Sequence, residues 1–317
     1  MKRRYPLLAA LLVLLIALGF YVEHRLGRIL RSQLTDGELT AIFESESKGF
    51  AELGYLEGTT RRLRYLQVGN KPDRPLLVFI HGAPASGIFW LGMMRDSALR
   101  ARTNMLAIDR PGYGGSGLGK PMTNVAEQAE NIAAVIRARR QPGQPVVLHG
   151  SSYGGTVTAR IAMDFPDLVD GFLLMSASTA PEEEYTYWVS RPSTHWSLRW
   201  LIPRAIHTAN HEKLAHQYEL EKMADQWGSI NAPAVILHGT DDWLIYPENA
   251  YNSCAQIEES DAPLVIHHMF EGKEHDLMWT APKKLRKYLH FLLDVVEDAQ
   301  EPEPEQIGPT EAGLATS

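Results

Sequence analysis

Between residues 60 and 295 the sequence alternates short aliphatic or β-branched runs with longer stretches of helical periodicity. This alternation is typical of a largely parallel sheet whose strands are joined and covered by helices. The predicted strands are Arg62 to Val68, Leu76 to Ile80, Met105 to Ile108, Val146 to Leu148, Gly171 to Met175, Ala234 to Leu237 and Leu264 to His268. The predicted fold class is α/β, with functional residues in the loops beyond the carboxyl ends of the strands.

Composition excludes several classes of protein. The chain has 317 residues, 44% hydrophobic and 22% charged, as expected of a globular protein with a water-excluding core. Its formal net charge of −7 provides no basic field to neutralise phosphates, so we expect no nucleic-acid partner. The single cysteine, Cys254, cannot form an internal disulfide or build a zinc or iron-sulfur site by itself.

The N-terminus differs from the rest of the chain. A basic start, Met1-Lys2-Arg3-Arg4, precedes an uncharged run over residues 5–22 that would span roughly 27 Å as a helix, close to the thickness of a hydrocarbon core. A cleaved secretory signal fits the same order, but Ala17-Leu18-Gly19 is a poor cleavage site and the run is long. We therefore expect a single membrane anchor with the remainder on the non-cytoplasmic side, periplasmic or extracellular; secretion after cleavage is the alternative.

The strongest chemical signal follows the predicted strand at Val146. That strand enters Gly150-Ser151-Ser152-Tyr153-Gly154, a Gly-x-Ser-x-Gly motif, and a helical stretch follows it. The two glycines allow strand and helix to pass closely around a strained turn, which projects Ser152 outward at the positive end of the helix. Ser152 is the predicted nucleophile; the competing interpretation is a glycine-rich structural turn.

A serine nucleophile needs a base, and the base needs a group that orients it and stabilises its cation. Two later loops supply these types of residue in the order acid and then histidine. Asp241 and Asp242 follow one predicted strand, and His275 follows the last one. One of the two adjacent aspartates is expected to be structural.

These segments, together with His81-Gly82-Ala83-Pro84 and the loop from Asp109 to Ser116, resemble the α/β-hydrolase fold family across roughly Thr59 to Asp294. Within that family, the sequence resembles the serine-nucleophile branch, which includes esterases and lipases with a small cap. The resemblance implies a triad that consists of the nucleophile Ser152, the acid Asp242 and the general base His275. Asp241 is the alternative acid.

The same resemblance implies an oxyanion hole formed by the backbone amides of Ala83 and Tyr153. The loop from Asp109 to Ser116 is interpreted as scaffold that braces this hole. Because the triad supplies its own base and no ligand cluster is visible, no organic cofactor and no metal are predicted.

The predicted organisation has four parts. Residues 1–31 form the anchor or signal segment, residues 32–58 a juxtamembrane linker, residues 59–296 the α/β-hydrolase domain and residues 297–317 a disordered acidic tail. Within the domain, an insertion at about residues 181–231 is rich in tyrosine and tryptophan and is expected to form a small helical cap over Ser152.

The predicted activity is hydrolysis of carboxylic esters, with lipid or other apolar acyl esters as candidate substrates. A serine nucleophile favours acyl chemistry, whereas dehalogenases and epoxide hydrolases of the same family use an aspartate. The alternatives are a carbon-carbon hydrolase, a thioesterase, an acyltransferase or a non-catalytic binding protein on the same fold.

Overall fold

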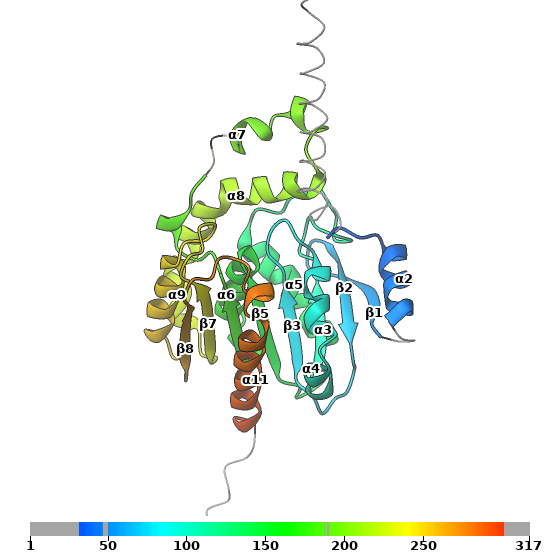
Figure 1. Ribbon diagram of the computed structural model, residues 1–317, viewed down its shortest axis with the longest axis vertical. Coiled ribbons are helices and arrows are strands. Elements are labelled where there is room, and N and C mark those ends of the chain that lie inside the picture. Colours follow the sequence, from blue (N-terminus) through cyan, green and yellow to red (C-terminus); the bar gives the residue numbers. More distant parts are fainter. Residues whose placement is uncertain (1–31, 47–49, 187, 189, 301–317) are drawn as a thin grey trace, which may run out of the picture.

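The computed structural model describes residues 32–46, 50–186, 188 and 190–300 (Figure 1). The expected anchor over residues 5–22 lies outside the described residues. Of the expected tail, residues 297–317, the part from residue 301 onward also lies outside them, whereas Glu297 and Asp298 are the last residues of a helix, α11 (Pro282–Asp298). Within the described part of the chain, no helix combines the length and the apolar character needed to cross a bilayer.

The centre of the molecule is an eight-stranded sheet in the order β1-β2-β4-β3-β5-β6-β7-β8. The first two pairings, β1 with β2 and β2 with β4, are antiparallel, and the others are parallel. The strands are β1 (Glu52–Glu57), β2 (Arg62–Val68), β3 (Leu76–Ile80), β4 (Asn104–Ile108), β5 (Val146–Ser151), β6 (Gly171–Met175), β7 (Ala234–Gly239) and β8 (Val265–Phe270). The prediction of an α/β fold with a largely parallel sheet is confirmed.

Helices cover both faces of the sheet, because successive side chains of a strand point to opposite faces. On β3, Leu76, Val78 and Ile80 join one hydrophobic core, whereas Leu77 and Phe79 join the other. The first core includes residues of α5 (Val125–Arg139), α6 (Tyr153–Asp164) and α9 (Glu248–Glu258). The second includes residues of α2 (Asp36–Glu46), α3 (Leu91–Met94), α4 (Ser97–Arg102), α10 (Leu277–Thr280) and α11 (Pro282–Asp298).

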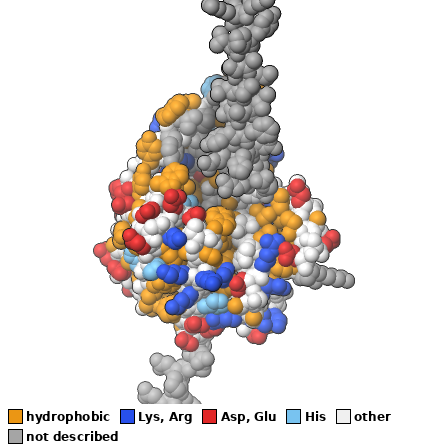
Figure 2. All heavy atoms as spheres, viewed as in Figure 1, with side chains coloured by type: hydrophobic (Ala, Val, Ile, Leu, Met, Phe, Trp, Pro, Cys, Tyr) orange, Lys and Arg blue, Asp and Glu red, His pale blue; other side chains and the backbone are white. Residues whose placement is uncertain are grey.

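Helix α11 shows how the sequence dictates this layering. Its buried residues, Leu285, Leu289, Leu292, Leu293 and Val296, recur every three or four positions and so form one apolar stripe. The opposite side carries charge. On the face in Figure 2, basic side chains gather near α11 with acidic ones among them. Arg102 of α4 forms ion pairs with Asp294 and Glu297 of α11.

The segment between β6 and β7 is mostly helical and lies beyond the carboxyl ends of the parallel strands (Figure 1). Its elements are η3 (Pro181–Glu183), α7 (Ser190–Ser193), η4 (Trp196–Leu198), α8 (Arg204–Met223) and η5 (Ala224–Ser229). Helix α8 is the longest of these, and it is fixed to the domain beneath it by a buried ion pair between Glu212 and Arg110 of the loop after β4. This arrangement places α8 over the loops that carry the predicted site residues.

Candidate active site

Ser152 lies at the sharp turn between β5 and α6. Its backbone has φ 55° and ψ −128°, a conformation that is costly for a residue with a side chain. The turn is tight because Gly154 lies against the β3 loop: a Cβ atom at this position would overlap with the carbonyl oxygens of Ile80 and His81. The structure therefore presents Ser152 at the N-terminus of α6, where helical amide groups create a positive potential.

Asp242 and His275 are brought together by the loops after β7 and β8. His275 Nδ1 lies 2.8 Å from Asp242 Oδ2, and the other carboxylate oxygen accepts hydrogen bonds from the backbone amides of Leu244 (3.0 Å) and Ile245 (2.9 Å). Asp241, the alternative acid, is exposed and accepts a hydrogen bond from the neighbouring Thr240 hydroxyl at 2.9 Å. Asp242, rather than Asp241, thus has the position of an acid that orients His275.

The environment of Asp242 favours its ionised form. Burial alone would raise the pKa of this carboxyl, but hydrogen bonds from His238 and His275 outweigh burial and hold the pKa well below its usual value. A buried carboxylate next to His275 fixes the ring so that Nδ1 carries a proton and Nε2 is left to accept one.

His238 is a contact of the site that the sequence analysis did not identify. It lies in β7, and its Nε2 atom is 3.3 Å from Asp242 Oδ2 and 2.9 Å from the carbonyl oxygen of Ile245. It therefore supports both the carboxylate and the loop that follows. Its place at the end of a strand, four residues before Asp242, was the available signal.

Gly239 explains why the two loops can meet. A Cβ atom on this residue would overlap with the carbonyl oxygen of Lys273. The same carbonyl accepts a hydrogen bond from the amide of Asp241 at 2.9 Å, and the amide of Thr240 bonds to Phe270 at 3.1 Å. Backbone contact between the loops thus sets the distance from the acid to His275.

Ser152 and His275 line the same cavity, which has a volume of about 820 Å³. The remaining lining is mostly apolar and includes Ile88, Phe89 and Trp279. Within the described ranges, no hydrogen bond joins the Ser152 hydroxyl to His275. Hydrogen bonds between a nucleophile and its base are often long in the absence of substrate.

The loop after β3 passes close to Ser152. Ala83 lines the cavity beside Ser152, and a Cβ atom on Gly82 would lie only 2.8 Å from the Ser152 Cβ. Tyr153 follows Ser152 at the start of α6. The two residues predicted to supply oxyanion-hole amides therefore both lie next to the predicted nucleophile.

The loop from Asp109 to Ser116 contacts this region through charged side chains. Asp109 Oδ1 accepts a hydrogen bond from the amide of Gly87 (2.7 Å), and Arg110 Nε donates to the carbonyl oxygen of His81 (2.7 Å). Arg110 also pairs with Glu212 of α8, at 2.6 Å, with both side chains fully buried. One arginine thus connects the β3 loop to α8.

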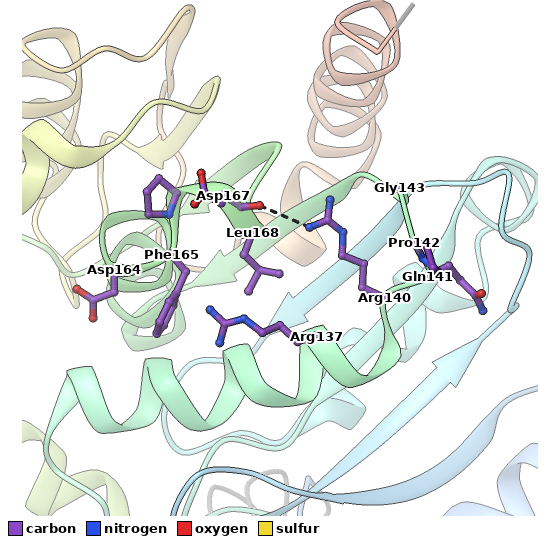
Figure 3. Close-up of a pocket in the computed structure, with 10 residues that line it drawn as sticks. Arg137, Arg140, Gln141, Pro142, Gly143, Asp164, Phe165, Asp167 and Leu168 are labelled. Carbon is purple, nitrogen blue, oxygen red and sulfur yellow. Dashed lines mark hydrogen bonds between the residues drawn. The ribbon is translucent and has the colours of Figure 1, made fainter.

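A smaller cavity of about 210 Å³ lies on the other side of Ser152, beneath α8. A third cleft, of about 560 Å³, lies near the amino ends of β5 and β6, where α5 and α6 end (Figure 3). Its charged residues largely pair with one another or with their neighbours, as Arg140 does with Asp170 and Asp164 with Arg160. Chemistry therefore centres on the two cavities that meet at Ser152.

Comparisons with known proteins agree with this architecture. Epoxide hydrolase 1 of Caenorhabditis elegans is 26% identical over 231 residues, which are 67% of this chain and 55% of the relative. A 1-acylglycerol-3-phosphate O-acyltransferase of Arabidopsis thaliana is 27% identical over 157 residues, 46% of this chain and 36% of the relative. The chain therefore spans about half of the first relative and about a third of the second.

Solved structures show the same fold. A membrane phospholipase A, described as a bacterial virulence factor, has a TM-score of 0.60 at 21% identity, with 94% of this chain and 100% of that chain covered. The monoacylglycerol lipase of Paleococcus ferrophilus has a TM-score of 0.59 at 20% identity, with 73% and 98% covered. The model of the alpha/beta hydrolase family matches residues 77–288, which is more than half of the chain. The chain therefore belongs to the alpha/beta hydrolase family.

Proposed function

We propose that the protein is a serine hydrolase that cleaves carboxylic esters through an acyl-enzyme intermediate. The observation that carries the proposal is the buried Asp242 carboxylate at 2.8 Å from His275 Nδ1, with His275 on the same cavity as Ser152. This is the arrangement that an activated serine requires.

The proposed reaction has two halves. His275 Nε2 takes the hydroxyl proton as Ser152 Oγ attacks the ester carbonyl carbon, and the amides of Ala83 and Tyr153 donate to the oxyanion. His275 then gives this proton to the oxygen of the leaving alcohol, and the carbon-oxygen bond breaks. A water molecule, deprotonated by His275, attacks the acyl-enzyme, releases the acid and restores the Ser152 hydroxyl.

The identity of the nucleophile argues against epoxide hydrolysis as the activity of this protein. The first relative is an epoxide hydrolase by name. Opening an epoxide through a covalent ester intermediate requires a carboxylate nucleophile, and Ser152 has a hydroxyl. Acyl chemistry is what a hydroxyl nucleophile with a histidine base supports.

The substrate is proposed to be apolar in part. Ile88, Phe89 and Trp279 line the larger cavity, and the segment of residues 181–231 is proposed to act as a cap over the site. The lipase and phospholipase among the similar structures are consistent with lipid-like esters. We also propose that residues 5–22 anchor the chain in a membrane, with the catalytic domain on the non-cytoplasmic side.

The nucleophile is tested by labelling the full chain with a fluorophosphonate and mapping the adduct. One adduct is expected, on Ser152, together with turnover of p-nitrophenyl esters; Ser152→Ala should lose both, and His275→Ala should lose turnover. Cys254→Ala is a control, because this residue lies in α9 and lines neither of the two cavities at Ser152. A folded wild-type protein without an adduct would refute the proposal.

Anchoring is tested by fractionation and by the intact mass of the mature chain. Retention in membranes after washing at high pH, with the full-length mass, is expected; a mass that lacks the first residues would indicate a cleaved signal instead.

A further inference from the structure

The two cavities at Ser152 have different chemistry. They share Ser152 and Ala83, but His275 lines only the larger one. The smaller cavity is lined in addition by ionisable residues of the segment over the site, among them Glu184, Lys213 and His216. The reaction described above uses none of these three residues.

Glu184 is a buried carboxylate that joins two parts of this segment. Its oxygens accept hydrogen bonds from Lys213 Nζ, from the Ser178 hydroxyl and from His216 Nδ1, the last at 2.9 Å. Burial would raise the pKa of Glu184, but His216 and Lys213 outweigh burial and lower the pKa to about 2. The carboxylate is therefore ionised and already has three donors.

His216 is also held by hydrogen bonds. The Thr156 hydroxyl donates its single hydrogen to the carbonyl oxygen of Ser178, so it can only accept from His216 Nε2, which lies 3.1 Å away. His216 Nδ1 faces the Glu184 carboxylate. Both ring nitrogens are thus engaged in this network, and His216 has none left for a substrate.

Lys213 is the member with donors to spare. An ammonium group has three hydrogens, and among the described residues Glu184 is its only hydrogen-bond acceptor. The Lys213 side chain is 27% exposed and lines the smaller cavity. Two N–H groups are therefore left to bind a substrate oxygen.

The formal charges around the smaller cavity indicate what kind of oxygen this is. Lys213 contributes one positive charge, and Glu184 and Glu183, which also lines the cavity, contribute two negative charges. These charges leave no positive excess, so the cavity does not attract an anion strongly. A neutral acceptor, such as a ketone or ether oxygen, therefore suits the remaining N–H groups of Lys213 better than an anion does.

The position of His275 decides which part of an ester enters the smaller cavity. The leaving oxygen must lie near His275 to receive its proton, so the alcohol part extends into the larger cavity. The acyl part points away from His275, toward the cavity beneath α8. A volume of 210 Å³ has room for about seven water-sized groups, at the roughly 30 Å³ that a water molecule occupies in the liquid, and so suits a short acyl group.

We propose that the cavity beneath α8 is an acyl subsite for a short acyl group that carries an uncharged oxygen acceptor, which Lys213 binds. This inference rests on the proposed ester hydrolase activity and specifies its substrate: a small, polar acyl part and a larger, apolar alcohol part.

The test compares two esters of the same shape. In p-nitrophenyl 4-oxopentanoate the acyl group carries a ketone, and in p-nitrophenyl 4-methylpentanoate a methyl group replaces the ketone oxygen. Each acyl group has seven non-hydrogen atoms, and the leaving group is the same. The readout is kcat/KM of the full chain for the ketone ester divided by kcat/KM for the methyl ester. This ratio is corrected by dividing it by the ratio of the rates at which hydroxide alone hydrolyses the same two esters.

The wild-type protein is expected to prefer the ketone by about tenfold or more, since a hydrogen bond to a charged donor is gained. Lys213→Met, which keeps the length of the side chain, should bring the ratio close to one. Lys283→Met, the same change at an exposed position of α11, should leave the ratio at its wild-type value. Circular dichroism establishes that each variant is folded.

Two results would overturn the inference while the hydrolase stands: equal rates for the two esters in the wild-type protein, or an unchanged ratio in Lys213→Met. The second would mean that Lys213 only ties Glu184 to α8, because a structural role lowers both rates together. Failure to hydrolyse either ester, without a fluorophosphonate adduct on Ser152, would refute the proposed function itself, and the subsite with it.

Discussion

The buried ion pair between Arg110 and Glu212 leads to a quantitative prediction. Burial would lower the pKa of Arg110, but Glu212 more than compensates and raises it, so the guanidinium is charged. Glu212→Leu removes the only carboxylate that a described residue offers to this cation and leaves the charge in the core. Removing one partner of a buried pair costs about 3 to 5 kcal/mol of unfolding free energy.

This cost is large enough to measure by thermal unfolding. At roughly 2 to 4 °C per kcal/mol for a domain of this size, the melting temperature should fall by about 6 to 20 °C. Glu221→Leu is the matched control, because Glu221 lies on the exposed side of the same helix, and a change within about 0.5 kcal/mol is expected there.

A double-mutant cycle separates the pair from its surroundings. In Arg110→Met with Glu212→Leu both charges are removed, so the loss should be smaller than the sum of the single losses by about 1.5 kcal/mol or more. Strict additivity, or a loss below about 1 kcal/mol in Glu212→Leu alone, would refute the view that this pair fastens α8 to the loops beneath it.

Three further predictions concern the site. Asp242→Asn should lower kcat by roughly 10⁴-fold because the ring loses its orienting carboxylate, whereas Asp241→Asn should change it less than about threefold; ester turnover distinguishes them, and equal losses would contradict the assignment. Gly239→Ala should displace His275 and lower kcat/KM more than tenfold, while circular dichroism shows that the unlabelled variant is folded. Turnover at the wild-type rate would show that the close contact of Gly239 with the Lys273 carbonyl is unimportant. Because the pKa of Glu184 falls from 4.5 to about 2 on folding, its ionised form stabilises the protein above pH 4.5, and this contribution, about 3 kcal/mol at most, is lost as the pH falls toward 2. Urea unfolding of wild type and Glu184→Gln should therefore differ most near pH 6 and converge in acid, and a difference that is constant with pH would contradict this.

Most of the sheet could be predicted from the sequence. The bounds of β2, β3 and β6 agree with prediction. Strands β3 and β6 are nearly continuous apolar runs, as buried strands of a parallel sheet require. Strand β1 was not predicted. It lies at the edge of the sheet with β2 as its neighbour there, is only half-buried and contains Gly54 between charged ends, so its sequence does not resemble a core strand.

The candidate site was predictable where residues act through motifs and not where they meet through folding. Asp242 and His275 follow strands, so the fold alone brings their loops to one edge. Glu184, Lys213 and His216 come from two separate parts of the segment between β6 and β7, and nothing in their spacing indicates that they share hydrogen bonds. Their proximity is a result of how α8 packs.

The backbone of Ser152 has an evolutionary consequence. The conformation at φ 55° costs a non-glycine residue on the order of 1 to 3 kcal/mol, and a glycine would adopt it freely. Selection for thermal robustness alone would therefore favour glycine at this position. Under the proposed mechanism that exchange would abolish activity, so residue 152 is the position where descendants that have lost the proposed activity would be recognised first.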